Sequence, residues 1–112
     1  MNDTPVSDIR WNNKTAIIDA CGEIDLHQSA VLQQKLLDVL DQKPDRMIIN
    51  LANVAYMDSS GVASLVKLLS RTRKNGISLG LAAPTKKVRA IFEITRLDSV
   101  FDIFDTEEEA LA

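Results

Sequence analysis

The chain has 112 residues, the length of one domain, and a net charge of -3. Hydrophobic residues make up 46% and charged residues 26%, proportions that exclude disordered, collagen-like and disulfide-dense chains. No apolar stretch reaches the roughly 20 residues of a membrane-spanning helix, the amino terminus shows no secretory signal, and a single cysteine, Cys21, cannot form an internal disulfide. We therefore expect one domain over residues 1–112, located in the cytoplasm.

The first half of the chain predicts two strands, a helix and a third strand. Short apolar segments at residues 9–11 and 16–21 indicate two strands joined by a turn. A helical pattern runs from Ser29 to Pro44, with its apolar stripe formed by Leu32, Leu36, Val39 and Leu40. Residues 47–51 are apolar almost without alternation, as in a strand covered on both faces, so we expect this strand to be central.

The second half continues the alternation of helices and strands. A second helical stripe ends near Asn75-Gly76 and consists of Val62, Leu65, Val66 and Leu69. A strand over residues 77–82, a helix after Pro84, a strand over residues 100–104 and a helix starting at Thr106 follow. The order predicts an α/β fold, with a mixed and mostly parallel central sheet of about five strands covered by about four helices.

Charge is distributed unevenly. Residues 1–58 carry 5 basic and 9 acidic side chains, residues 59–92 carry 7 basic and none acidic, and residues 93–112 carry 1 basic and 7 acidic. The basic block is either an anion-binding surface or the exposed faces of two helices. The helical spacing of Lys67, Arg71 and Lys74 favours exposed faces, and the shortage of aromatic residues in the block argues against direct nucleic-acid binding.

Functional residues are expected where strands end and helices begin, in the loops at residues 22–28 and 55–61. In the second loop, Asp58 and Ser59 are strong amino-terminal caps. Gly61 allows close backbone approach, and we expect N–H groups to point outward there, as in an anion site. Three interpretations of the segment remain. It serves only as a helix cap, it presents a serine for phosphorylation, or it holds a nucleophile. Ser59 is the favoured phosphate acceptor, because we expect Ser60 to form a local hydrogen bond.

Enzymatic readings lack essential parts. A serine nucleophile needs an activating base, and the chain has one histidine, His27, which we expect to be a cap or exposed. A receiver-like domain phosphorylated on Asp58 needs an adjacent acidic pair and a lysine after a later strand, and neither is found at the expected place. We therefore predict no catalytic residue, no cofactor and no metal site, and we expect Cys21 to be a small buried side chain.

Three segments resemble the STAS domain of bacterial anti-sigma factor antagonists, and the resemblance runs in order over residues 9–109. They are Gly22-Glu23-Ile24-Asp25, Ile48-Ile49-Asn50-Leu51 and Met57-Asp58-Ser59-Ser60-Gly61-Val62. The most specific element is the Asp-Ser-Ser-Gly segment between a buried strand and a helix. The family resemblance implies a non-catalytic binding module that, when unphosphorylated, binds an anti-sigma factor and thereby releases the sigma factor.

The same resemblance implies the site residues and the partners. Ser59 matches the serine that an anti-sigma factor serine kinase phosphorylates and a PP2C-type phosphatase dephosphorylates. The expected partner-binding residues are Asp25, Asp58, Ser59, Ser60, Gly61, Lys67 and Arg71. The first alternative is a STAS domain of another signalling or transport assembly, such as a stressosome-like scaffold or a lipid-transport accessory subunit, and the second, ranked below it, is the receiver-like domain modified at Asp58.

Overall fold

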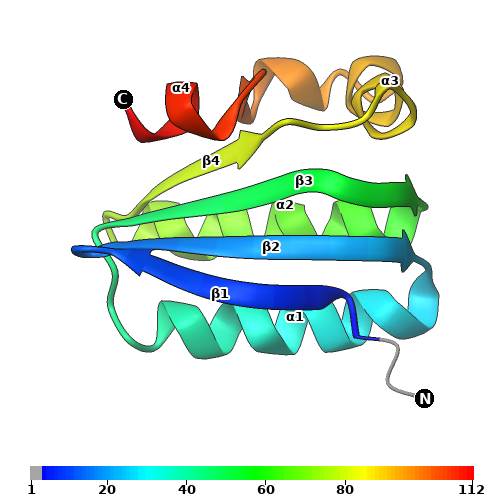
Figure 1. Cartoon of the computed structure of the whole chain (residues 1–112). Helices are drawn as coiled ribbons and strands as arrows, with labels where there is room; N and C mark the ends of the chain where they lie inside the picture. The colour runs from blue at the N-terminus through cyan, green and yellow to red at the C-terminus, as the bar shows by residue number, and fades with distance from the viewer. Residues whose placement is uncertain (1–3) are drawn as a thin grey trace.

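The computed structural model describes residues 4–112, which form one five-stranded sheet with helices on both faces (Figure 1). The elements are β1 (Val6–Asn12), β2 (Thr15–Ile24), α1 (Leu26–Leu40), β3 (Arg46–Met57), α2 (Ser59–Lys74), β4 (Ser78–Ala82), α3 (Lys86–Ile94), the short 3-10 helix η1 (Leu97–Ser99), β5 (Asp102–Phe104) and α4 (Glu107–Leu111). The strand order is β1-β2-β3-β4-β5. Only β1 is antiparallel to its neighbour. The prediction of a mixed, mostly parallel sheet is confirmed.

The larger core lies between one face of the sheet and helices α1, α2 and α3. Ile18 of β2 and Met47 and Ile49 of β3 face this core, where Leu36 of α1 and Leu65 of α2 are fully buried. Phe92 of α3 joins the same core and contacts Phe101 edge-on, with ring centroids 5.4 Å apart. β3 is the middle strand, and its predicted central position is confirmed because the side chains on both of its faces are buried.

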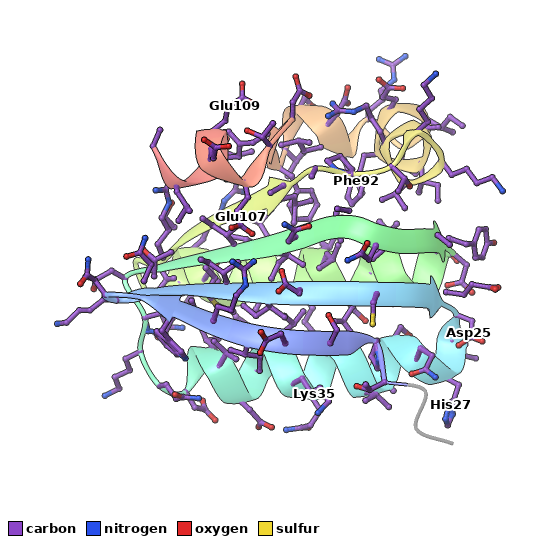
Figure 2. The ribbon with its side chains drawn as sticks, viewed as in Figure 1. Asp25, His27, Lys35, Phe92, Glu107 and Glu109 are labelled. Carbon is purple, nitrogen blue, oxygen red and sulfur yellow. The ribbon has the colours of Figure 1, made fainter. Side chains whose placement is uncertain are left out.

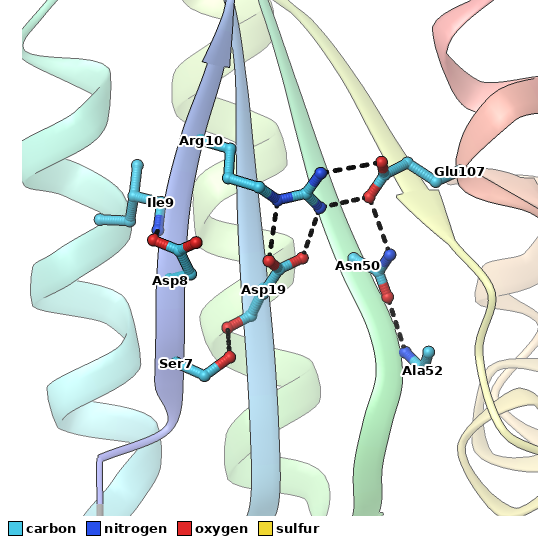
Figure 3. Close-up of polar contacts among 8 residues, drawn as sticks. All are labelled: Ser7, Asp8, Ile9, Arg10, Asp19, Asn50, Ala52 and Glu107. Carbon is cyan, nitrogen blue, oxygen red and sulfur yellow. Dashed lines mark hydrogen bonds and ion pairs between the residues drawn. The ribbon is translucent and has the colours of Figure 1, made fainter.

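The opposite face of the sheet is covered at one end by α4. Ala110 of α4 is buried against Ile17, Ile48 and Ala82. Arg10 of β1 holds α4 against the sheet through two ion pairs. Its guanidinium donates to Asp19 of β2 at 2.7 Å and to Glu107 of α4 at 3.0 Å (Figure 3). The Asn50 amide of β3 donates to Glu107 at 2.9 Å (Figure 3). The first strand and the last helix are thus joined across 97 sequence positions.

Several predicted boundaries and one buried position are wrong. α1 begins at Leu26 rather than Ser29, because Asp25 caps it. β5 covers only residues 102–104, because the N–H groups of Val100 and Phe101 donate to the Leu97 carbonyl in the turn that ends η1. Val66 remains 40% exposed, and Leu68 is buried in its place. The buried stripe of α2 is centred on Leu65, Leu68 and Thr72, which leaves Val66 at its edge.

The structure also corrects the expectation for Cys21. This side chain lies on the face of β2 opposite the larger core and is only partly buried. Its thiol donates to the Thr4 carbonyl at 3.3 Å. Within residues 4–112, no helix has both the length and the apolar character needed to cross a membrane.

Candidate functional site

The two loops expected to carry function lie side by side. β2 and β3 are neighbouring parallel strands, and Ile24 at the end of β2 is in register with Met57 at the end of β3. The backbone N–H of Asp58 donates to the Ile24 carbonyl at 3.1 Å. α1 and α2 therefore begin next to each other at the carboxyl edge of the sheet (Figure 1).

Both helices begin with an aspartate cap of the same backbone geometry. Asp25 and Asp58 each have a φ of -93°, and their ψ angles are -173° and -174°. The Asp25 carboxylate accepts the N–H of Gln28, and the Asp58 carboxylate accepts the N–H of Ser60, each at 2.9 Å. Leu26 and Ser59 are consequently equivalent positions, the first residue of each helix.

Asp58 makes more hydrogen bonds than an ordinary cap. Its Oδ1 atom also accepts from the Ser60 hydroxyl and from the N–H of Gly61 at 3.4 Å. The Ser60 hydroxyl, followed by the N–H groups of Ser60 and Gly61, holds the pKa of Asp58 below its usual range, although desolvation opposes them. We expected the N–H groups of this loop to point outward, as in an anion site. This expectation is wrong for Ser60 and Gly61, because their N–H groups already donate to the Asp58 carboxylate. The local bonding expected of Ser60 is confirmed.

Ser59 is the exposed hydroxyl of this loop. It is the first residue of α2, directly after the Asp58 cap, and its side chain lies at the surface. The structure shows no hydrogen bond from a described residue to the Ser59 hydroxyl. His27 is exposed near the start of α1 (Figure 2), and no hydrogen bond joins it to Ser59. The geometry therefore leaves the Ser59 side chain accessible from solvent.

Gly61 is required at its position by packing. A Cβ atom there would lie 2.5 Å from Cγ of Met57 and 2.9 Å from Cγ2 of Ile24. Both neighbours are fully buried. The absence of a side chain thus lets the first turn of α2 sit directly on the ends of β2 and β3, as the sequence predicts for this glycine.

An apolar groove opens beside Ser59, between the start of α2 and the end of α3. Its volume is about 430 Å³, and we call it the α2–α3 groove. Its lining residues are Tyr56, Met57, Asp58, Ser59, Val62, Ile91 and Thr95. Sequence patterns did not reveal this groove, because Ile91 and Thr95 come from an element whose position over the sheet is set by tertiary packing.

The remaining predicted site residues lie along α2. Lys67 and Arg71 are exposed, about two and three turns after Ser59. Within residues 4–112, no three His, Cys, Asp or Glu side chains come close enough together to hold a metal ion.

These features define a small α/β domain that presents a serine at the carboxyl edge of its sheet, next to an apolar groove. The family model of the STAS domain matches residues 7–110, and the chain belongs to this family. The anti-sigma-B factor antagonist of Bacillus subtilis (strain 168) is 33% identical over 96 residues, which cover 86% of this chain and 87% of the relative. The anti-sigma-F factor antagonist RsfB of Mycobacterium tuberculosis (strain CDC 1551 / Oshkosh) is 28% identical over 103 residues, which cover 89% of this chain and 81% of the relative.

Solved structures show the same fold. A putative anti-sigma factor antagonist from Thermotoga maritima superposes with a TM-score of 0.88 at 22% identity, covering 93% of this chain and 90% of the other. The anti-sigma factor antagonist SpoIIAA in its unphosphorylated form gives a TM-score of 0.79 at 25% identity, covering 93% and 91%. SpoIIAA has also been solved in a phosphorylated form.

Proposed function

We propose that this chain is a non-catalytic, cytoplasmic anti-sigma factor antagonist that phosphorylation of Ser59 switches off. The observation that carries the proposal is the exposed Ser59 hydroxyl at the start of α2, in a chain that is 33% identical to an anti-sigma-B factor antagonist. The unphosphorylated chain binds an anti-sigma factor serine kinase and releases the sigma factor. A PP2C-type phosphatase restores the unphosphorylated form.

The proposed contact surface surrounds Ser59. Asp25, Asp58 and Ser60 lie at the two helix starts, and Gly61 brings the first turn of α2 down onto the sheet. The exposed cations Lys67 and Arg71 extend the surface along α2. Their charge is complementary to acidic groups on the partner.

Phosphorylation is expected to act at this surface and not through the fold. A phosphoserine carries a charge of about -1.5 to -2, and the amino terminus of a helix stabilises negative charge. The phosphate therefore leaves α2 intact, and its bulk and charge repel the partner beside Asp58. A hundredfold loss of affinity requires only about 2.7 kcal/mol. Amide exchange of the phosphorylated and unmodified chains tests this, because loss of protection over residues 62–72 would contradict a local effect.

The function is tested by substitution of Ser59. With the kinase-type anti-sigma factor of the same organism, Ser59→Ala is expected to bind the partner and accept no phosphate, and Ser59→Glu is expected to bind poorly. Ser70→Ala is the matched control, because Ser70 is another exposed serine of α2. Transfer of phosphate to Ser59→Ala at the unmodified rate would refute the assignment. Acid treatment adds a check, because phosphoserine survives acid and an aspartyl phosphate on Asp58 does not.

A further inference from the structure

Two large apolar side chains are far more exposed than the others of the described chain. Leu26 is 74% and Ile94 is 81% exposed, whereas the other exposed large apolar residues lie between 38% and 46%. A single exposed leucine is ordinary. Leu26 begins α1 and Ile94 ends α3, the two helices next to the start of α2, where exposed apolar side chains would extend the apolar groove into one contact surface.

Leu26 lies beside Ser59 because of the paired helix starts. It follows Asp25 as Ser59 follows Asp58, with the same backbone angles at the two caps. The two starts are joined by the hydrogen bond from the Asp58 N–H to the Ile24 carbonyl. Leu26 therefore presents on α1 an apolar side chain at the position where α2 presents the serine hydroxyl.

Ile94 is the last residue of α3, the helix whose Ile91 and C-cap Thr95 line the α2–α3 groove. On a helix, residues three and four positions apart are surface neighbours. Ile94 is thus next to Ile91, three positions earlier, and it directly precedes Thr95; both Ile91 and Thr95 line the groove together with Ser59. Leu26 comes from α1 and Ile94 from α3, so the two apolar side chains belong to the two helices next to the start of α2.

We infer that Leu26 and Ile94 are the apolar anchor residues that the anti-sigma factor kinase contacts when it binds this chain to phosphorylate Ser59. The inference rests on the proposed function. A protein partner of ordinary interface size covers about 800 Å² on each side, so a kinase seated on Ser59 also covers the flanking helix ends. Interfaces place apolar anchors near the centre and charged groups at the rim. The partner therefore presents apolar side chains toward Leu26 and Ile94, with acidic groups outside them facing Lys67 and Arg71.

The inference is tested with Leu26→Ser, Ile94→Ser and the double substitution. Val100→Ser is the matched control, because Val100 is an apolar residue with 40% exposure that directly precedes the short loop into β5, toward the amino edge of the sheet and away from the start of α2. Affinity for the unmodified kinase-type anti-sigma factor is measured by calorimetry. Each single substitution is expected to weaken binding at least tenfold and Val100→Ser less than twofold. At saturating kinase, the rate of phosphate transfer to Ser59 is expected to stay unchanged. All four variants should keep the wild-type circular dichroism, because the altered side chains are exposed.

Unchanged affinity of the double variant would overturn the inference and leave the proposed function intact, provided that Ser59→Glu still binds poorly. If the unmodified chain does not bind the kinase at all, the proposed function fails and the inference fails with it. Sedimentation of the isolated chain tests whether a second copy of the chain binds this surface instead. Substitutions that abolish self-association without changing affinity for the kinase would assign Leu26 and Ile94 to contacts between two copies and refute the inference.

Discussion

Replacing Gly61 by alanine is the most direct test of how α2 sits on the sheet. The added Cβ atom would lie 2.5 Å from Cγ of Met57 and 2.9 Å from Cγ2 of Ile24, closer than the Cβ atoms of real proteins approach such neighbours. Met57 can change rotamer, but Ile24 is branched at Cβ and is stiff. Both side chains are fully buried, so they have no solvent into which to move. The helix or the strand ends must shift instead.

Two effects of opposite sign determine the change in the free energy of unfolding. Overpacking a close-packed core costs about 1–3 kcal/mol. The higher helix propensity of alanine stabilises a helix by about 1 kcal/mol relative to glycine. Because two buried side chains are contacted, we place the overpacking cost in the upper part of its range. Gly61→Ala is then expected to destabilise the chain by about 1–2 kcal/mol after the propensity gain is subtracted.

Urea unfolding at equilibrium measures this change as a lower midpoint with an unchanged slope. Ala63→Gly is the matched control, because Ala63 is exposed on the same helix and reports the propensity alone. The control is expected to lose about 1 kcal/mol. If Gly61→Ala is as stable as the wild type or more stable, the side chains of Met57 and Ile24 move aside without cost. Packing then does not require glycine at position 61.

Three further predictions concern the charged groups. Arg10→Met removes the two ion pairs of Arg10, worth about 0.5–2 kcal/mol together for such exposed pairs, and should speed amide exchange in residues 107–112 while exchange in α2 stays unchanged. Arg10 lowers the pKa of Glu107 from its ordinary value of 4.5. The stabilisation is therefore present above pH 4.5 and is lost as the pH falls through the lower pKa of the folded state. The free energy of unfolding, measured between about pH 6 and 3, should depend less on pH in Arg10→Met than in the wild type. Ser60→Ala removes the hydroxyl hydrogen bond that contributes most to the lowered pKa of Asp58, and NMR titration should show that pKa rising toward its ordinary value.

The order of strands and helices and the position of Ser59 could be predicted from the sequence. Parallel neighbouring strands end at one edge, so the loops after β2 and β3 had to meet there. Ser59 follows a good cap residue, and the first turn of a helix is normally exposed. These features depend on local residue types and on the sheet topology, which periodicity reports well.

Features that depend on distant contacts could not be predicted. Nothing local to Arg10 indicates that it binds Glu107 at the other end of the chain. The burial of Leu68 in place of Val66 depends on how α2 is rotated against the sheet, which a stripe of apolar residues fixes only to within about one position. The α2–α3 groove depends on the placement of α3, and the sequence pattern of α3 contains no information on its direction across the sheet.

The cap of α2 separates the stability of the fold from the proposed signal at Ser59. The amino terminus of a helix normally has N–H groups ready for an anion, but the Asp58 carboxylate already accepts those of Ser60 and Gly61. A phosphoryl group on Ser59 therefore does not find these donors vacant, and it enters beside an anion whose low pKa keeps it charged. Its charge remains directed outward from the exposed first residue of the helix. In the proposed switch, a partner would meet that charge directly, without any change in the core beneath Gly61.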